Sequence, residues 1–462
     1  MRLVIIGNGV AGIEAALAAR RQDKQASITI ISEESDHFFS RTALVWVLAG
    51  QMNYRDIEPF ERDLYQRENF HRIRARVRNI EPERQELMLE GREEPLQYDR
   101  LLLALGSRPR RPPWANVNLK GIGHFVSLQD LAWAESALFG RNLSDCDAGH
   151  IVKTPPGPSL TETLSPYARR DTLFAECGAP ENPCIIGGGL IGLELAEVLS
   201  SLGRKVRLLE HGDRLWPAAL HQPESDWVMK RLSDAGVQVE LRQEVTELVG
   251  DEQHRIRGIR TSSESFTCDF CVVAVGVQPN TSWLSELSIT RQRDGAIEVD
   301  PQLQTAIPNI YAAGDCAAVK RDAGEHQLET LWYAARAQGR VAGRNLAGGS
   351  EMYQEPIRYN AAKLMDLEFT TVGEMSAEQD AAADWFFHER GRVQSMTRLC
   401  QAKGRLRGFH SLGRRWDTEQ IESWVGEGAS LEWVTRNLHQ ASFDSEGVPP
   451  LRVPGKHRLG AG

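Results

Sequence analysis

Two copies of one glycine pattern constrain the fold of this chain more than any other feature of its sequence. In the first copy, Gly7, Gly9 and Gly12 fit Gly-x-Gly-x-x-Gly directly after a short apolar run of strand type. Such glycines allow a tight strand-to-helix turn and let the backbone approach a pyrophosphate closely. The helix that follows the turn would offer free N–H groups and the positive end of its dipole to the phosphates, with Val10 and Ala11 among the cofactor-binding residues. The pattern predicts a dinucleotide site.

An acidic residue completes this first copy. Residues 27–31 form a second strand-like run, and Glu33 and Glu34 follow it, about 20 residues beyond the last glycine. A carboxylate at that place can accept hydrogen bonds from the ribose of a bound dinucleotide. The first copy is therefore a complete strand–turn–helix–strand–acid unit.

The second copy repeats the whole unit near the middle of the chain. Its glycines and the start of its helix are Gly187, Gly189, Gly192, Leu190 and Ile191. Its second strand ends at Glu210. One such pattern is weak evidence, because glycine-rich turns are common, but two complete units predict two Rossmann-type sites. The carboxylate of Glu210 would accept from a 2′-hydroxyl and repel a 2′-phosphate, which favours NADH over NADPH at this site.

Composition narrows the classes of function. The chain has 462 residues and a formal net charge of −9, which argues against a nucleic-acid partner, since such proteins are basic. No apolar run approaches the ~20 residues that cross a bilayer, and the N-terminus begins a strand rather than a secretory signal. The seven cysteines are scattered and do not resemble a disulfide framework. We expect a cytoplasmic protein without a membrane partner.

Cys268 and Cys271 form a C-x-x-C pattern, which raises the question of a redox or metal pair. Their segment reads as a strand, and positions i and i+3 of a strand point to opposite faces. We therefore favour two buried structural cysteines, with a redox or metal pair as the alternative. No other spacing in the sequence indicates a metal site.

Four further segments, in a fixed order, make the sequence similar to the pyridine nucleotide–disulfide oxidoreductase superfamily of FAD/NAD flavoproteins. They are "YDRLLLALGSRPRRPP", "CDFCVVAVGVQPN", "TAIPNIYAAGDCAAV" and "LETLWYAARAQGRVAGRNLAG". Leu105 departs mildly from the usual threonine in the first of them. The resemblance implies that FAD and NAD are the cofactors. The further cofactor-binding positions that it implies are Val77, Ala104, Gly106, Ser107, Gly276, Asp315, Leu331 and Trp332.

The resemblance also implies an α/β fold with an interrupted layout. Two Rossmann-type, three-layer domains are expected, an FAD domain at 1–112 and 280–350 and a NAD domain at 113–279. A Pro-rich insertion falls at about 139–183 within the NAD domain. Residues 355–462 would form an α+β domain used for dimerisation or partner binding, with Trp424 and Trp433 in its core. A homodimer or a monomer is expected.

Within the superfamily, "HFFSRTAL" is closest to the ferredoxin, rubredoxin and nitrite reductase-type branch. Arg41 matches an arginine that reaches the FAD pyrophosphate. Thr42 stands where the thiol-using branches carry a redox cysteine, so electrons would leave the flavin without a thiol. Relatives often pair a lysine near Trp46 with the glutamate that matches Glu194. Without that lysine, Glu194 would be unpaired, with a raised pKa, or paired with Arg41. It is the candidate catalytic residue, with a carboxylate that only orders the nicotinamide site as the alternative.

We therefore hypothesise a FAD-dependent NADH:acceptor oxidoreductase, in which a hydride passes from NADH to flavin N5 and electrons then pass to an external acceptor. The basic segment 390–415 indicates a small acidic redox protein such as a ferredoxin or rubredoxin as that acceptor, although it could equally be the solvated edge of a hairpin. Two alternatives stay open. One is an NADH:quinone or oxygen oxidoreductase, and the other is a flavin-bearing, redox-responsive interaction protein of the apoptosis-inducing-factor type.

Overall fold

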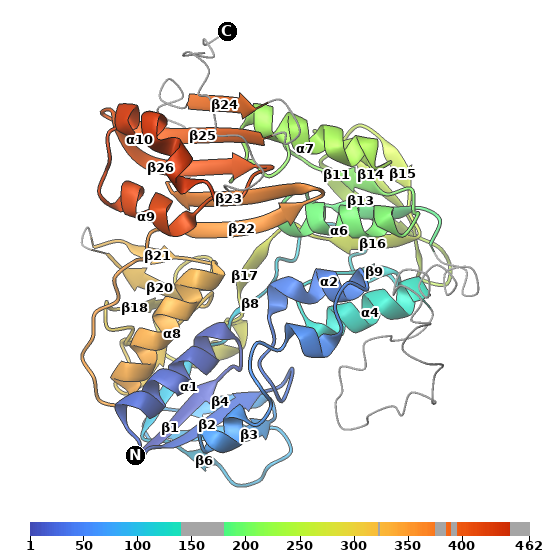
Figure 1. Ribbon diagram of the computed structural model, residues 1–462. Helices are drawn as coiled ribbons and strands as arrows, with labels where there is room; N and C mark the ends of the chain where they lie inside the picture. Colours follow the sequence, from blue (N-terminus) through green and yellow to red (C-terminus); the bar gives the residue numbers. More distant parts are fainter. Residues whose placement is uncertain (140–179, 322–323, 375–384, 390–394, 444–462) are drawn as a thin grey trace, which may run out of the picture. The chain divides into compact units, whose positions relative to one another are not determined.

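The computed structural model describes residues 1–139, 180–321, 324–374, 385–389 and 395–443 (Figure 1). It divides into two compact units, and each is described by itself. Unit 1 comprises Met1–Ile186, Ser201–Arg204 and Val245–Gln354, and unit 2 comprises Gly187–Ser200, Lys205–Glu244 and Glu355–Gly462. The fold class is mixed α/β with parallel sheets, as predicted. The three-domain layout stays a prediction, and the insertion at about 139–183 lies almost wholly outside the described residues.

A parallel five-stranded sheet forms the centre of unit 1. Its order is β19 (Ile310–Ala312), β7 (Arg100–Leu103), β1 (Arg2–Ile6), β2 (Ser27–Ser32) and β3 (Phe70–Arg74). The central strands are apolar along almost their whole length, as expected for parallel strands covered on both faces. A strand from late in the chain, β19, thus completes a sheet that the N-terminus begins.

Two helices of this sheet, α1 (Val10–Gln22) and α8 (Trp332–Leu346), pack closely against each other (Figure 1). Glycines make the approach possible, because a Cβ at Gly339 or Gly343 would overlap the backbone of Ala11 or Ala15. Arg336 and Arg340 of α8 donate to the buried carboxylate of Glu14, at 2.9 and 2.8 Å. This pairing fixes α8 beside the first glycine turn.

The other elements of unit 1 are short. Three strands form the parallel group β10 (Pro183–Ile186), β16 (Phe270–Val273) and β9 (Ile122–Gly123). Antiparallel groups are β4 (Val77–Glu81), β5 (Glu86–Leu89) and β6 (Leu96–Gln97); β13 (Val245–Gly250), β14 (Ile256–Thr261) and β15 (Ser265–Thr267); and β8 (Ser107–Pro109) with β17 (Val277–Pro279). A mixed group contains β18 (Ile297–Val299), β20 (Ala317–Lys320) and β21 (His326–Leu328). The helices are η1 (Arg41–Ala43), α2 (Leu44–Leu48), η2 (Tyr54–Ile57), α3 (Leu64–Arg67), α4 (Leu128–Phe139) and η3 (Ser282–Leu284).

Unit 2 contains the second glycine turn and the C-terminal region. The helix α6 (Leu190–Ser201) follows the turn, β11 (Arg207–Leu209) pairs in parallel with β12 (Gln238–Glu240), and α7 (Gln222–Asp234) lies between them in sequence. The C-terminal sheet is antiparallel, in the order β22 (Tyr359–Leu364), β23 (Leu367–Gly373), β26 (Arg405–Leu412), β25 (Ser395–Ala402) and β24 (Trp385–Glu389). It is followed by α9 (Thr418–Gly426), α10 (Leu431–Asn437) and η5 (Leu438–Ala441).

The two tryptophans expected in the C-terminal core differ. Trp424 is buried, at 3% exposure, in a cluster with Leu399, Phe409 and Trp416. Trp433 is 44% exposed and touches Trp424 edge-on, with ring centroids 5.6 Å apart. The prediction was wrong for Trp433, because its side chain lies on the solvent-exposed face of α10.

The C-x-x-C pair is buried and its thiols are free, as predicted. The reason given for that prediction was wrong, because Cys268 precedes β16 and only Cys271 lies in it. Cys268 is hydrogen-bonded to both Cys184 and Cys271. The bond to Cys184 lowers the pKa of Cys268, but the bond to Cys271 and burial outweigh it and raise the pKa. Buried thiols with a raised pKa are chemically inert.

The described residues contain no cluster of three or more His, Cys, Asp or Glu side chains arranged to hold a metal ion. In that same part of the chain, no helix is both long enough and apolar enough to cross a bilayer.

Candidate functional site

The first glycine turn has the shape that a pyrophosphate requires. Gly7 has a φ of +115°, and its N–H donates to the Ile31 carbonyl at 2.8 Å. A Cβ at Gly7 would overlap Ala104, and one at Gly12 would overlap the Gly7 carbonyl. At Gly9, by contrast, a Cβ would meet no protein atom within 4 Å. The turn is therefore tightly packed at Gly7 and Gly12 and open at Gly9, next to Val10 and Ala11 at the start of α1.

Asn8, inside this turn, has a partner that the sequence did not reveal. The Tyr65 hydroxyl donates to Asn8 Oδ1 at 2.9 Å and accepts from the Phe38 N–H at 2.8 Å. Burial raises the pKa of Tyr65, so it remains a neutral donor. Because Tyr65 lies in α3, far from Asn8 in sequence, no local pattern could have predicted the contact.

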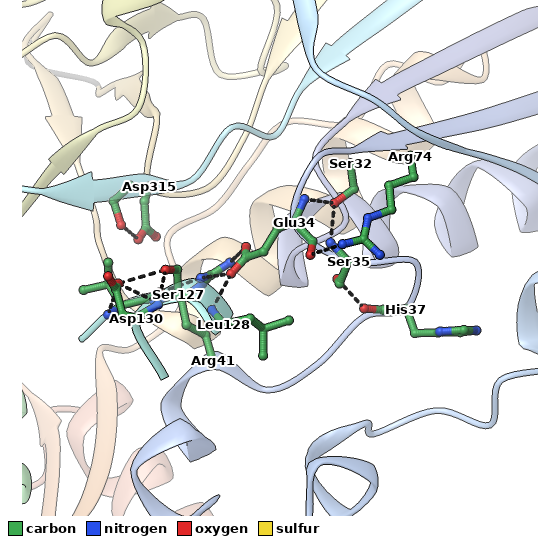
Figure 2. A network of polar contacts seen from close by, with 12 residues as sticks. Ser32, Glu34, Ser35, His37, Arg41, Arg74, Ser127, Leu128, Asp130 and Asp315 are labelled. Carbon is green, nitrogen blue, oxygen red and sulfur yellow. Dashed lines mark hydrogen bonds and ion pairs between the residues drawn. The ribbon is translucent and has the colours of Figure 1, made fainter. Parts of the chain in front are cut away.

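Arg41 and Glu34 form the centre of the polar network in Figure 2. The guanidinium binds the carboxylate at two points, from Nη1 to Oε1 at 2.9 Å and from Nη2 to Oε2 at 2.6 Å. Arg41 also donates to the Val126 carbonyl at 2.5 Å, and Glu34 accepts from the Leu128 N–H at 3.0 Å. Partial burial of Arg41 acts to lower its pKa, but Glu34 and, at longer range, Asp315 outweigh this effect and raise the pKa.

Asp315, from the second predicted FAD segment, accepts a hydrogen bond from Ser107 Oγ at 2.8 Å (Figure 2). Burial raises the pKa of Asp315, although Ser107 and Arg41 act in the opposite direction. The neighbouring Gly314 N–H donates to the side chain of Gln338, which is fully buried in α8, at 2.8 Å. Two predicted FAD residues, Ser107 and Asp315, are thus in direct contact, and Gln338 was missed.

The two acids after β2 do not occupy the place that Glu210 occupies in the second copy. Gly7 N–H bonds Ile31, and Gly187 N–H bonds Leu209 in the same way, each at 2.8 Å. The residue after Ile31 is Ser32, so Ser32 corresponds to Glu210, and Glu33 and Glu34 lie one and two residues further on. The side chain of Glu33 is 52% exposed and pairs with Arg76 at 2.9 Å.

The remaining predicted positions of unit 1 lie next to β8 and β17, in β4 and at the start of α8. Gly106 and Gly276 have positive φ, and a Cβ at either would meet nothing within 4 Å. Val77 is buried at the start of β4. Leu331 caps α8, and Trp332 begins it, with the Arg336 guanidinium 5.5 Å from its ring centroid.

In unit 2, the carboxylate of Glu210 is hydrogen-bonded to the second glycine turn. Its Oε2 accepts from the Gly188 N–H at 2.6 Å, and its Oε1 accepts from the Gly212 N–H at 2.8 Å. His211 Nδ1 lies 2.8 Å from the same Oε1. Glu210 is only 4% exposed, while a Cβ at Gly189 would meet nothing within 4 Å. The sequence predicted a ribose acceptor here, and the structure adds that this carboxylate holds the turn.

Comparison with known proteins supplies the family. The family described as "Pyridine nucleotide-disulphide oxidoreductase" matches residues 1–339. The chain belongs to this family. It is 28% identical over 380 residues to an NADH oxidase of Methanocaldococcus jannaschii, covering 81% of this chain and 76% of the relative. It is 26% identical to the ferredoxin–NAD(+) reductase component of a p-cumate 2,3-dioxygenase system of Pseudomonas putida, covering 93% and 94%.

Among solved structures of the family fold, the chain is similar to the ferredoxin reductase for the CYP199A2 system of Rhodopseudomonas palustris. The TM-score is 0.73 at 22% identity, with 95% of this chain and 99% of the other covered. An NAD-dependent persulfide reductase from A. fulgidus gives a TM-score of 0.77 at 23% identity, covering 94% and 79%. This oxidoreductase uses FAD and NAD(P)H. The open face at Gly9 and the first amides of α1 fit an anionic dinucleotide.

The position of the family's redox cysteine carries no thiol in this oxidoreductase. Thr42 lies in η1, and its hydroxyl is 3.2 Å from that of Ser40. The five free cysteines of the described residues are all buried. A hydroxyl cannot form a mixed disulfide, so this segment offers no thiol relay.

Glu194 lies in α6, one turn before Glu197. Burial, and secondarily the negative charge of Glu197, raise the pKa of Glu194 to about 8. Glu197 itself accepts from the Met365 N–H at 2.8 Å. Within unit 1, Arg41 binds Glu34, and the two alternatives for Glu194, unpaired or paired with Arg41, stay predictions. With a pKa of about 8, Glu194 is largely a neutral carboxylic acid at pH 7.

Several cations of the basic segment 390–415, which was expected to form a partner surface, are buried or paired with acidic side chains. Arg398 is fully buried and donates to Glu224 at 3.0 Å. Arg407 pairs with Glu374 at 3.1 Å, and Arg415 pairs with Glu368 at 2.9 Å. Residues 390–394 lie outside the described part. The segment gives fewer exposed, uncompensated cations than its sequence indicated.

Proposed function

We propose that the chain is a cytoplasmic, FAD-dependent NADH:acceptor oxidoreductase whose first candidate acceptor is a small acidic redox protein, such as a ferredoxin or rubredoxin. The observation that carries the proposal is Thr42 at the place of the redox cysteine, in a chain with two open glycine turns. FAD, when bound, accepts a hydride at N5 and releases electrons one at a time. That chemistry needs no thiol from the protein.

The residues of the chain bind and orient the two dinucleotides. In the first site, we assign the pyrophosphate to the Gly9 turn and the start of α1, with Arg41 as a charged donor. In the second, the Gly189 turn and the first amides of α6, at Leu190 and Ile191, would hold the NADH pyrophosphate. Glu194 would order the nicotinamide or hold a proton near it, and as a mostly neutral acid it would donate a hydrogen bond rather than accept one.

We propose a preference for NADH over NADPH, and its support is Glu210. A buried carboxylate that holds the glycine turn leaves a negative charge beside the adenosine ribose, and a 2′-phosphate would be repelled. The exposed imidazole of His211, bonded to Glu210, is the neighbouring group that could offset this repulsion.

An oxygen acceptor is the second candidate, because relatives of this chain include proteins named NADH oxidases. The relative named as a ferredoxin–NAD(+) reductase component covers 93% of the chain, more than either NADH oxidase, and it supports the first candidate. A quinone acceptor and an interaction role of the apoptosis-inducing-factor type are further outcomes of the same experiment.

Stopped-flow reduction of the FAD-loaded protein by NADH, followed by a panel of acceptors, tests the proposal. We expect fast flavin reduction and turnover with an acidic ferredoxin or rubredoxin that slows as salt rises, because exposed charges are screened beyond about 10 Å at 0.1 M salt. Charge reversal at the exposed Arg405 should weaken that turnover but not ferricyanide reduction. Turnover with oxygen or quinone alone would contradict the acceptor, and slow reduction with a long-lived NADH complex would favour the interaction role.

A further inference from the structure

We propose that the turn at the start of α4 is part of the FAD site and that Asp130 is the positioning residue that keeps it there. The α4 turn comprises residues 126–130. It acts through Arg41 and Glu34, and it needs no contact of its own with the cofactor.

Two backbone groups of the α4 turn hold the Arg41–Glu34 pair. The Val126 carbonyl accepts from Arg41 Nη1 at 2.5 Å, and the Leu128 N–H donates to Glu34 Oε1 at 3.0 Å (Figure 2). Leu128 is the first residue of α4, so its N–H is one of the helix amides that have no partner within the helix. Because both contacts come from the backbone, they depend on the shape of the turn rather than on its side chains.

Asp130 determines that shape. Its Oδ2 accepts from the N–H of Val126 at 2.9 Å, the N–H of Ser127 at 2.9 Å and the hydroxyl of Ser127 at 2.8 Å. The Ser127 hydroxyl in turn accepts from the Asp130 N–H at 3.1 Å. These reciprocal bonds form a capping box. The helix behind the turn is anchored by Trp133, whose ring stacks on Phe270 with centroids 5.0 Å apart.

The held arginine still presents donors to an anion. Both N–H groups of Nη1 and one of Nη2 donate to Glu34 and Val126. The Nε–H group, on the other edge of the guanidinium, makes no hydrogen bond to the described residues. The Arg41 side chain retains 45% of its accessible surface. A guanidinium fixed at one edge and open at the other is preorganised for a phosphate. If the α4 turn loosens, Arg41 loses that orientation and FAD leaves more readily.

The test measures release of FAD from the loaded protein, followed by the rise in flavin fluorescence. Asp130→Ala removes three acceptor contacts, and we expect FAD to dissociate about tenfold faster, as for the net loss of one or two hydrogen bonds. Asp130→Asn keeps an acceptor oxygen and should stay within about threefold of the parent. The matched control is Asp251→Ala, since Asp251 also accepts from two backbone amides and one side chain, in the hairpin between β13 and β14.

A double-mutant cycle with Arg41→Ala separates positioning from general stability. If the turn acts through Arg41, Asp130→Ala should add almost nothing to the FAD loss of the Arg41→Ala protein. Thermal unfolding of the cofactor-free proteins should show similar shifts for Asp130→Ala and Asp251→Ala. Equal FAD release from those two variants, or additive effects of Asp130→Ala and Arg41→Ala, would overturn the proposal.

Discussion

At the scale of single residues, two glycines of one turn predict opposite outcomes for the same substitution. A side chain at Gly9 meets no protein atom within 4 Å, so Gly9→Val should fold but place its side chain where the pyrophosphate belongs. A side chain at Gly12 overlaps the Gly7 carbonyl, so Gly12→Val should fail to fold. Flavin absorbance per polypeptide and far-UV circular dichroism distinguish the two. A yellow Gly9→Val protein would contradict the assignment of this turn to FAD.

Glu210 gives the second prediction at this scale. Because its carboxylate accepts from Gly188 and Gly212, Glu210→Ala should weaken NADH binding by about 1–3 kcal/mol through two unsatisfied amides. The same change removes the repulsion of a 2′-phosphate, so the gap between NADH and NADPH should narrow. Dissociation constants for both nucleotides from stopped-flow reduction check this. Unchanged NADH affinity would show that the turn does not depend on Glu210.

At the scale of elements, we predict that Glu194 of α6 makes the free energy of unfolding depend on pH. The pKa of Glu194 is about 8 in the folded chain and about 4.3 in the unfolded chain. Between these pH values the unfolded chain has lost the Glu194 proton while the folded chain keeps it, so the free energy of unfolding falls as pH rises. The slope is at most ~1.4 kcal/mol per pH unit, and less because the side chain is only partly buried. Glu194→Gln should flatten this slope in urea unfolding across the neutral range. Glu197→Gln should lower the pKa of Glu194. A slope that survives Glu194→Gln would assign it to another group.

The C-terminal sheet gives a second prediction at this scale, through the ion pair between Arg398 of β25 and Glu224 of α7. Both side chains are buried, with 0% and 3% of their surface exposed. Arg398→Ala leaves a buried carboxylate without its cation and should cost about 3–5 kcal/mol. Replacing the exposed Arg405 by alanine is the control and should cost little. Equal effects in urea unfolding would contradict a structural role for the buried pair.

The elements also show what the sequence could predict. Glycine turns, their strands and their first helical residues follow from local chemistry, so both dinucleotide units were predictable. Tyr65 reaches Asn8 across 57 residues, and Arg41 reaches Val126 across 85, and no local pattern carries such contacts. The Ser127 and Asp130 spacing is a capping signal that could have located the start of α4, but not its contact with Glu34. From the sequence alone, Arg398 would be assigned to the surface, whereas the structure shows it buried beside Glu224.

At the scale of the whole molecule, we propose that electrons leave this flavoprotein without a thiol relay. The described cysteines are buried, and Thr42 stands at the position of the family's redox cysteine, so the described residues offer no accessible thiol there.

The most direct test is turnover of the FAD-loaded protein with NADH and an acidic ferredoxin, before and after exhaustive alkylation of accessible thiols. We expect the same rate in both cases, with disulfides remaining poor acceptors throughout. Loss of ferredoxin reduction on alkylation, with flavin reduction by NADH intact, would contradict it and would place a cysteine in the electron path.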